Sequence, residues 1–361
     1  MNISIVTPYT NTPELMRNFL NITIPIVEKY NYELVLVKDD KCSIEMMNEI
    51  EELIKDKPNI KNITDKIVQG CSIVNNRGVD NASHELILFI NNDVFLKDDT
   101  AELLKEKLLS DNQIGIVQAL LLYPNTNLVQ STGHVFGEYF NTHALINRDY
   151  HDAIVQEEAL RQGLTNACCM MKKATFYQFG GYDEKFYNAW EGLELSIRVG
   201  ADGYKLVYYP TAVAYHIQGS SRERIFRNQS YQDAYFWLKS KPILKVDFHL
   251  LIMKQLMALN NFDINYDYHI INCSGYSFDQ WQPLLDLLKG HNEQHIITIY
   301  NKNDRIKLEE KIALDILYSY PRVIYLTDNY SQIKGNRYVF SQKNSKNDII
   351  IDISGNVIPV E

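Results

Sequence analysis

The sequence lacks the features of membrane, secreted and nucleic-acid-binding proteins. No apolar run approaches the length of about 18 residues that a membrane-spanning helix needs. The first residues, MNISIVTPYT, begin a strand pattern at once, without the basic and then apolar segments of a signal peptide. Positive charge is also scarce, because 36 Lys and Arg face 45 Asp and Glu, a net charge of −9. We therefore expect no broad surface for nucleic acid.

Cysteine is present but is not arranged for cross-links or zinc. The five cysteines are odd in number, and no two have the C-x-x-C spacing. This favours reduced thiols over a disulfide framework or a zinc site. Together with the missing signal peptide and spanning helix, it predicts a cytoplasmic protein with no transmembrane segment. The apolar fraction of 45% and the charged fraction of 22% are those of an ordinary globular protein.

Strand and helix patterns alternate along the first part of the chain. Buried-type strands are expected at 3–8, 33–38, 85–90 and 115–123, with helical patterns between them. Strands separated by helices of this length predict an α/β fold with a mostly parallel sheet flanked by helices. In such sheets ligands bind beyond the carboxyl ends of the strands.

The sequence after Pro242 reads as a separate unit. Strands are expected there at 268–274, 295–301 and 322–328, helices at 279–289 and 304–318, and a hairpin around Ser354-Gly355-Asn356. We therefore expect two domains, a larger one at 1–240 and a small α/β accessory domain at 245–361. No charged cluster at the strand ends of the smaller unit indicates catalysis.

Polar residues follow three strands of the larger domain at the points where the strands end. These clusters are Thr7 to Tyr9, Asp39-Asp40 and Asn91-Asn92-Asp93. Each alone is also typical of a turn, but all three are expected at one edge of the sheet, which favours a site. A single carboxylate beside amides, as at Asp93, suits a hard divalent cation that takes its other ligands from water and phosphate.

Three residues near these strand ends suit a nucleotide or its phosphates. Asp39 can accept hydrogen bonds from a base or a ribose hydroxyl, and Tyr9 can stack on a base, although a lone tyrosine is more often packed. His216 can ligate a metal or donate to a phosphate, although a lone histidine is more often structural. The following Gly219-Ser220-Ser221 and Arg222 would add hydrogen-bond donors and positive charge.

In their order along the chain, these segments resemble the family 2 glycosyltransferases of the GT-A fold, in a rhamnosyltransferase-like subgroup. The resemblance covers about 2–221, and seven motifs fall in the family's order. They are ISIVTPYTN, VLVKDD, NNRGVDNA, ELILFINNDV, VQSTGHVFG, NACCMMKKATFYQFGGYDEKF and GYKLVYYPTAVAYH. FINNDV resembles the family's metal motif in the variant with asparagine first, and GGYDEKF resembles G-G-F-D-E-x-F.

The resemblance implies metal-dependent transfer of a sugar from a nucleotide-diphosphate-sugar donor to an acceptor hydroxyl, with an inverting mechanism expected. It also implies a role for each candidate residue. Thr7, Tyr9 and Asp39 would hold the nucleoside, Asn76, Arg77, Asn91 and Asn92 would lie near the donor, Asp93 would coordinate Mn²⁺ or Mg²⁺ on the diphosphate, and His216 would contact that metal or the diphosphate. The metal's Lewis acidity would neutralise charge on the leaving group.

The sequence departs from its relatives at the expected base of an inverting transfer. The family usually reads E-D-x-D-L-x-x-R, with the aspartate after the first glutamate accepting the acceptor's proton. Here 191–198 reads EGLELSIR, so Gly192 stands at the base position, and Asn166 stands where a glycine is common. Either Glu191 or Glu194 serves as base, with Glu191 preferred, or another group or a retaining mechanism is used, or the domain is silent.

Two other functions are considered beside glycosyl transfer. The first is a catalytically silent nucleotide-sugar-binding or scaffolding subunit of a transferase complex. The second, a nucleotidyltransferase, should show a Gly-rich phosphate loop after the first strand, which TPYTNTPE does not supply. The expected acceptor is a saccharide, a lipid-linked saccharide or a protein, and the accessory domain would bind acceptor, a partner protein or a second copy of the chain.

Overall fold

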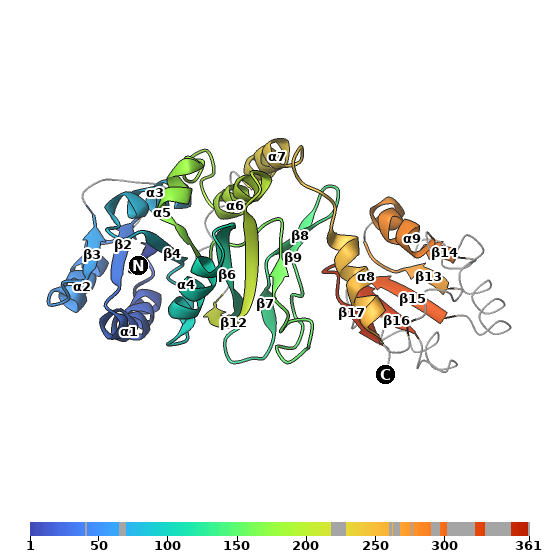
Figure 1. The fold of residues 1–361 in the computed structure, drawn as a ribbon, viewed down its shortest axis with the longest axis horizontal. Helices are drawn as coiled ribbons and strands as arrows, with labels where there is room; N and C mark the ends of the chain where they lie inside the picture. Colours follow the sequence, from blue (N-terminus) through green and yellow to red (C-terminus); the bar gives the residue numbers. More distant parts are fainter. Residues whose placement is uncertain are drawn as a thin grey trace. The chain divides into compact units, whose positions relative to one another are not determined.

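The computed structural model describes most of the chain, in ten segments. These are residues 1–39, 42–64, 70–217, 229–259, 262, 268–275, 277–289, 297–301, 322–328 and 348–359. Asp40 and the segment from Gly219 to Arg222 lie outside them. The chain divides into two compact units, Met1–His134 with Ile146–Lys245, and Val135–Leu145 with Val246–Glu361. Each unit has its own main sheet (Figure 1).

The larger unit is built on a mostly parallel sheet, as expected from the alternation of strands and helices. Its strand order is β10-β12-β6-β11-β4-β1-β2-β3, with β5 beside β12 and β7 beside β6. The strands are β1 (Ile3–Tyr9), β2 (Glu33–Lys38), β3 (Ile60–Ile63), β4 (Leu86–Ile90), β5 (Val94–Leu96), β6 (Ile114–Leu122), β7 (Val129–Ser131), β10 (Ala159–Leu160), β11 (Cys168–Lys172) and β12 (Lys205–His216).

One strand in the middle of this sheet runs against its neighbours. The pairs β1–β2, β1–β4, β2–β3 and β6–β12 are parallel, whereas β11 is antiparallel to both β4 and β6. The register pairs Cys168, the first residue of β11, with Ile90, the last residue of β4. The residues just before β11 therefore reach the same edge as the carboxyl end of β4.

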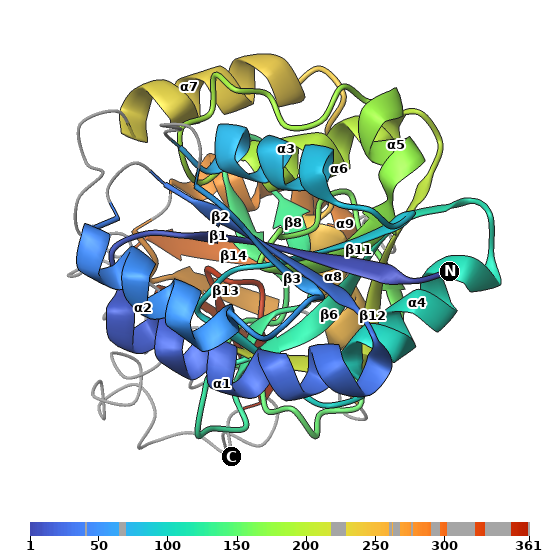
Figure 2. The ribbon, with the colours of Figure 1, turned by 90° about the vertical axis from the view of Figure 1, so that its left-hand side faces the viewer.

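Helices cover both faces of the sheet (Figure 2). On one face lie α1 (Pro13–Tyr30), α2 (Ile44–Ile54) and α4 (Thr100–Ser110), and on the other lie α3 (Cys71–Asn81), α5 (Lys173–Gln178) and α6 (Glu191–Ala201). Phe19, Ile50 and Leu104 belong to the apolar core of the first face. Val74, Phe176 and Leu195 belong to that of the second. An additional helix, α7 (Gln229–Ser240), contacts α6.

Local sequence explains where the first two helices begin and end. Pro13 occupies the first position of α1, where its missing N–H costs nothing. Asn31 ends α1 in the left-handed conformation, with φ 54°. Ser43 caps α2, because its side chain accepts a hydrogen bond from the N–H of Met46 at 3.2 Å.

The smaller unit has a five-stranded sheet with the order β14-β13-β15-β16-β17. Its first four strands are parallel, and β17 returns antiparallel to β16 through the expected turn at Gly355. The elements are α8 (Phe248–Ala258), β13 (Tyr268–Asn272), η2 (Phe278–Trp281), α9 (Gln282–Lys289), β14 (Ile297–Asn301), β15 (Arg322–Thr327), β16 (Ile349–Asp352) and β17 (Val357–Pro359). The helix expected at 304–318 lies outside the described residues.

A short arm, Val135–Leu145, belongs to this smaller unit although it comes from the middle of the larger one in sequence. It is formed by the paired strands β8 (His134–Phe136) and β9 (Asn141–His143). The Asp247 carboxylate accepts a hydrogen bond from the N–H of Phe136 at 2.7 Å, and the Phe140 ring packs edge-on against Phe248. These contacts hold the arm, and no local sequence pattern indicated them.

Two negative expectations concern the whole chain. Within the described segments, no helix has both the length and the apolar character needed to cross a membrane. The five cysteines, all within the described segments, are free thiols: Cys42, Cys71, Cys168, Cys169 and Cys273.

Candidate functional site

The strand ends of the larger unit converge on one edge. The N–H of Asp39, after β2, donates to the carbonyl of Tyr9 at the end of β1 (2.9 Å). The N–H of Asn91, after β4, donates to the carbonyl of Ala167 just before β11 (3.2 Å). The carbonyl of Asp93 accepts from the N–H of Ile217, just after β12 (2.9 Å). Main-chain hydrogen bonds thus join the ends of β1 and β2, and join the turn after β4 to the residues before β11 and after β12.

Asp93 and His216 form a polar pair at this edge. Oδ1 of Asp93 lies 3.2 Å from Nε2 of His216, and the Asp93 side chain is only 8% exposed. Strands β5 and β12 are antiparallel neighbours, with His216 opposite Val94, which brings the two residues together. The side-chain N–H of Gln130 donates to the His216 carbonyl (3.1 Å), and its Oε1 faces Nδ1 of His216 (2.5 Å).

This hydrogen-bonding pattern fits a divalent cation. Because Oε1 of Gln130 is an acceptor, the proton of a neutral His216 belongs on Nδ1, which leaves the lone pair of Nε2 beside the Asp93 carboxylate. Two lone-pair donors side by side, with the histidine's other nitrogen held by a neighbour, are the arrangement that metal-binding histidines show. No group of three or more His, Cys, Asp or Glu suited to a metal occurs among the described residues. A cation here would therefore draw ligands from its substrate or from water.

Asn91 and Asn92 flank this pair in different ways. Both main-chain groups of Asn91 are hydrogen-bonded, since its carbonyl also accepts from the N–H of Val94 (3.0 Å). The side chain of Asn92 donates to Oγ1 of Thr12, the residue before α1 (3.2 Å). Both residues therefore shape the turn that carries Asp93.

The predicted nucleoside residues have unequal access to a ligand. Thr7 is fully buried, and its Oγ1 has no hydrogen-bond partner in the described part of the chain. The Asp39 carboxylate accepts from the N–H of Gly70, just before α3 (3.3 Å). Tyr9 is 1% exposed, its hydroxyl donates to Oδ1 of Asn62 (2.8 Å), and burial raises its pKa. Because stacking on a base needs an exposed ring face, the buried Tyr9 ring is not a candidate for stacking on a nucleobase.

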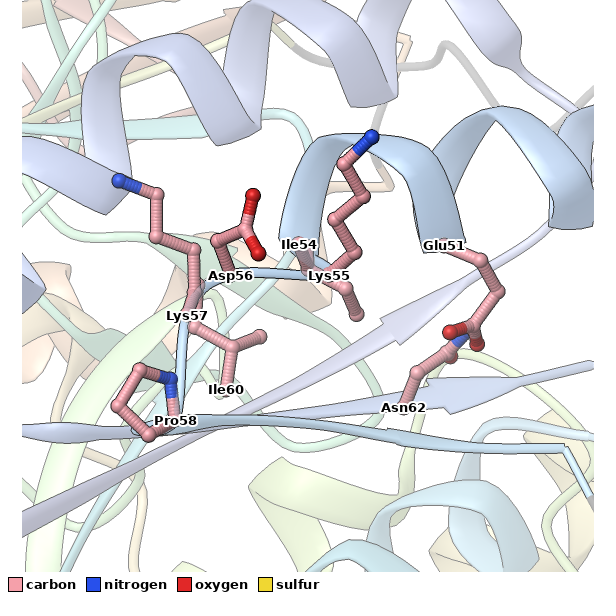
Figure 3. A pocket seen from close by; sticks show the side chains of 8 residues that line it. All are labelled: Glu51, Ile54, Lys55, Asp56, Lys57, Pro58, Ile60 and Asn62. Carbon is pink, nitrogen blue, oxygen red and sulfur yellow. The ribbon is translucent and has the colours of Figure 1, made fainter.

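Asn62, the partner of Tyr9, lines a separate pocket of about 460 Å³ between α2 and β3. Figure 3 shows Glu51 and Asn62 facing each other there, joined by a hydrogen bond of 2.6 Å from Nδ2 of Asn62. The two lysines of the pocket, Lys55 and Lys57, form ion pairs with Glu52 and Glu28. Glu51, Lys55 and Lys57 thus have partners within the protein, and we do not assign this pocket to the candidate site.

Asn76, on α3, holds the loop that contains the motif GGYDEKF. Its Oδ1 accepts from the N–H of Tyr182 (2.9 Å), and its Nδ2 donates to the Tyr182 carbonyl and to Oε1 of Glu184. Arg77 is the next residue of the same helix, and its carbonyl accepts from Nδ2 of Asn81. Asn76 therefore fixes a loop.

Glu191 is a buried carboxylate in the first turn of α6. Its Oε2 accepts from the N–H of Ala189 (2.8 Å), and its carboxylate also meets the thiol of Cys71. Burial raises the pKa of Glu191, although these hydrogen bonds to the charged form oppose the rise. Burial and the Glu191 charge together raise the pKa of Cys71, so the thiol stays protonated beside it.

Glu194, the other predicted base, is 1% exposed and paired with two cations. Arg198 holds it in a bidentate pair, with Nε 2.6 Å from Oε1 and Nη2 2.9 Å from Oε2. Lys239, from α7, approaches Oε1 at 2.8 Å. Because both oxygens accept charge-assisted hydrogen bonds, we do not carry Glu194 forward as a base.

Helix α7 fixes the segment that leads into α6, a role that the sequence patterns did not reveal. Oε1 of Gln232 accepts from the N–H groups of Tyr187 and Asn188, each at 3.0 Å. Asp233 accepts from the indole of Trp190 (2.6 Å), whose ring stacks on Phe236. The run QDAYFWLK was the available signal, since it mixes aromatic and polar residues that can anchor a neighbouring loop.

Gly192 packs directly on Asn166. A Cβ built on Gly192 would lie 2.3 Å from Cβ of Asn166 and 3.3 Å from its Cα, far inside van der Waals contact. The side chain of Asn166 is itself held, because the hydroxyl of Tyr182 donates to its Oδ1 at 2.5 Å. The two departures noted in the sequence therefore meet in space.

Comparisons with known proteins agree with this architecture. The family model described as glycosyltransferase like family 2 matches residues 4–241. The O-antigen biosynthesis protein RfbC of Myxococcus xanthus is 27% identical over 245 residues, covering 65% of this chain and 18% of that protein. An N-acetylglucosaminyl-diphospho-decaprenol L-rhamnosyltransferase of Mycobacterium tuberculosis is 33% identical over 61 residues, covering 17% of this chain and 20% of that protein. The chain thus spans only 18% to 25% of the length of the curated relatives it matches.

A solved structure shows the fold independently. The crystal structure of GalNAc-T7 with UDP, GalNAc and Mn²⁺ aligns with a TM-score of 0.55 at 15% identity, covering 89% of this chain and 58% of that one. With the family match, this confirms the expected GT-A fold, a mostly parallel sheet between two layers of helices.

Proposed function

Because the chain belongs to the glycosyltransferase-like family 2, we propose that it transfers a glycosyl group from a nucleotide-diphosphate sugar to an acceptor hydroxyl. The observation that carries the proposal is the Asp93–His216 pair at the edge where the polar strand ends converge. The named relatives support it, since one is an O-antigen biosynthesis protein and another is an L-rhamnosyltransferase. The rhamnosyltransferase's name also supports a saccharide or lipid-linked saccharide as acceptor.

Asp93 and His216 would hold Mn²⁺ or Mg²⁺, and GalNAc-T7, with Mn²⁺ and UDP, supports this assignment. Such an ion, when bound, stabilises the negative charge of the departing nucleoside diphosphate. The Gln130 side chain orients the His216 ring, and the hydrogen bonds of Asn91 and Asn92 keep the turn around Asp93 in place. Asp39, at the end of β2, would accept hydrogen bonds from the nucleoside.

Glu191 is proposed as the base of an inverting transfer. It is a buried carboxylate at the start of α6 with a raised pKa, and in the described part of the chain no cation pairs with it, in contrast to Glu194. A carboxylate of this kind can accept the proton of the acceptor hydroxyl as the new glycosidic bond forms. The N–H of Ala189 and the Cys71 thiol would stabilise it before it takes up the proton.

The test is turnover of a panel of UDP- and GDP-linked sugars with Mn²⁺, measured by release of the nucleoside diphosphate with and without saccharide acceptors. We expect one donor to be hydrolysed slowly and transferred faster when acceptor is present. The silent-subunit alternative is favoured by one observation, the glycine at position 192. Tight binding of a donor without release of its diphosphate under every condition would establish that alternative.

A further inference from the structure

Asn166 lies at the candidate site although its side chain has no role in the mechanism above. It precedes β11, whose antiparallel course brings this end of the strand to the carboxyl end of β4. The carbonyl of the next residue, Ala167, accepts from the N–H of Asn91. On its other side Asn166 touches Gly192, the neighbour of Glu191. It therefore adjoins both the segment that carries Asp93 and the segment that carries the proposed base.

The orientation of the Asn166 amide is set by two donors. The buried hydroxyl of Tyr182 donates to Oδ1 at 2.5 Å, and the thiol of Cys169 approaches the same oxygen at 3.4 Å. Nδ2, with its two N–H donors, is then the other end of the amide. None of the described residues accepts a hydrogen bond from Nδ2. Nδ2 is also not one of the fully buried polar atoms without a partner, so it is accessible to solvent. The side chain is partly exposed, so these donors face solvent.

Gly192 provides the space that keeps the amide in this position. The distances from a Cβ on residue 192 to Cβ, Cγ and Cα of Asn166 would be 2.3, 3.1 and 3.3 Å. A side chain at position 192 would fit only if Asn166 or the start of α6 moved, because 2.3 Å is far inside van der Waals contact. The pair therefore presents a fixed, uncharged donor at the edge of the site.

We propose, on the basis of the glycosyl transfer proposed above, that Asn166 is a specificity residue whose Nδ2 donates a hydrogen bond to a hydroxyl of the transferred sugar. The sugar is joined to the diphosphate, so it is the part of the donor that lies next to the Asp93 segment. A hydroxyl oxygen accepts from an amide N–H without the desolvation cost of an ionic partner. A donor held by Tyr182 and Gly192 also loses little side-chain entropy when it binds.

The experiment compares the affinities of a nucleotide sugar and of its nucleoside diphosphate, with Mn²⁺, in wild-type and variant full-length protein. The nucleotide sugar is the one selected from the UDP- and GDP-linked panel. Asn166→Asp keeps the shape and an acceptor for Tyr182 but replaces the N–H donors. We expect it to lower the preference for the nucleotide sugar over the diphosphate by about tenfold, the effect of one lost hydrogen bond.

A second variant separates this effect from charge and from folding. Asn166→Leu with Tyr182→Phe removes the amide and its internal partner together, leaves no buried hydroxyl unpaired and adds no charge. The same loss of preference in both variants is the expected result. An unchanged preference in both, or an equal loss of affinity for both ligands, would overturn the role of Asn166. If the wild-type protein binds diphosphates but prefers no nucleotide sugar, the proposed function itself fails.

Discussion

Gly192 packs so closely against Asn166 that a Cβ on Gly192 would lie only 2.3 Å from Cβ of Asn166. Residue 192 follows the proposed base directly and residue 166 precedes β11, so a steric contact joins two parts of the site. The glycine at position 192 is thus explained by packing against a larger neighbour.

Gly192→Ala is expected to destabilise the protein by about 1–3 kcal/mol, the usual cost of overpacking a closed site. Asn166→Gly in the same chain should remove most of that penalty, because it vacates the space that the new methyl group needs. Thermal unfolding of the wild-type, two single-variant and double-variant proteins measures the coupling. Additive effects of the two substitutions would show that the residues do not compete for space.

Asp93→Asn should weaken Mn²⁺-dependent binding of the nucleoside diphosphate by about tenfold or more, because a ligand charge is lost while the side-chain volume is kept. Isothermal titration with and without Mn²⁺ measures it. The matched control is Asp98→Asn, whose carboxylate is 58% exposed and pairs with Lys29 on the surface. Equal effects of the two substitutions would place the metal elsewhere.

Glu191→Gln should lower turnover by about 10²–10⁴ while donor affinity changes little, because the amide keeps the shape but cannot accept the proton. The wild-type turnover should rise with pH through the pKa of Glu191, which burial places above the usual value for glutamate. Turnover rises with pH because only the deprotonated carboxylate can act as base. Turnover of Glu191→Gln near the wild-type level would remove Glu191 from the mechanism.

Glu194→Gln is expected to act on stability. It weakens the pairs with Arg198 and Lys239, and removing one partner of a buried ion pair typically costs about 3–5 kcal/mol. The unfolding temperature should therefore fall, while turnover of the folded fraction persists. Loss of turnover at an unchanged unfolding temperature would make Glu194 the base in place of Glu191.

The lowered pKa of Glu33, at the start of β2, predicts that the stability of the folded protein depends on pH. Burial raises this pKa, but hydrogen bonds from Lys61, Ser4 and Ser83 outweigh burial and hold the pKa at about 2. A lowered folded-state pKa stabilises the protein above the unfolded-state value near 4.5, and this contribution is lost as the pH falls toward 2. Glu33→Gln should thus be less stable than wild type at pH 7, with a smaller difference at pH 3, measured by denaturant unfolding.

How far the sequence predicts the molecule depends on whether the relevant contacts are local. The alternation of strands and helices is a local pattern, and it predicted the mostly parallel sheet and the edge at which Asp93 lies. The burial of Tyr9 against Asn62 was not predictable, because it depends on how α2 and β3 pack. Nor was the pairing of Glu194 with Lys239, since α7 is distant in sequence and no periodicity links it to α6.

The contact between Gly192 and Asn166 shows the same limit. The sequence marked both residues as departures from the family pattern, but nothing in their spacing showed that they touch. The antiparallel course of β11, which a strand-by-strand pattern does not reveal, brings Asn166 to the edge of the sheet.

The Val135–Leu145 arm makes the smaller unit discontinuous in the gene, since its two pieces are separated by a stretch that encodes the other unit. During translation the arm is synthesised long before Phe248. The Phe140–Phe248 contact can therefore form only after the later segment has been made. For the same reason, recombination at a single point near Lys245 would leave the arm without its packing partner. A single recombination event therefore cannot transfer the whole smaller unit to another protein.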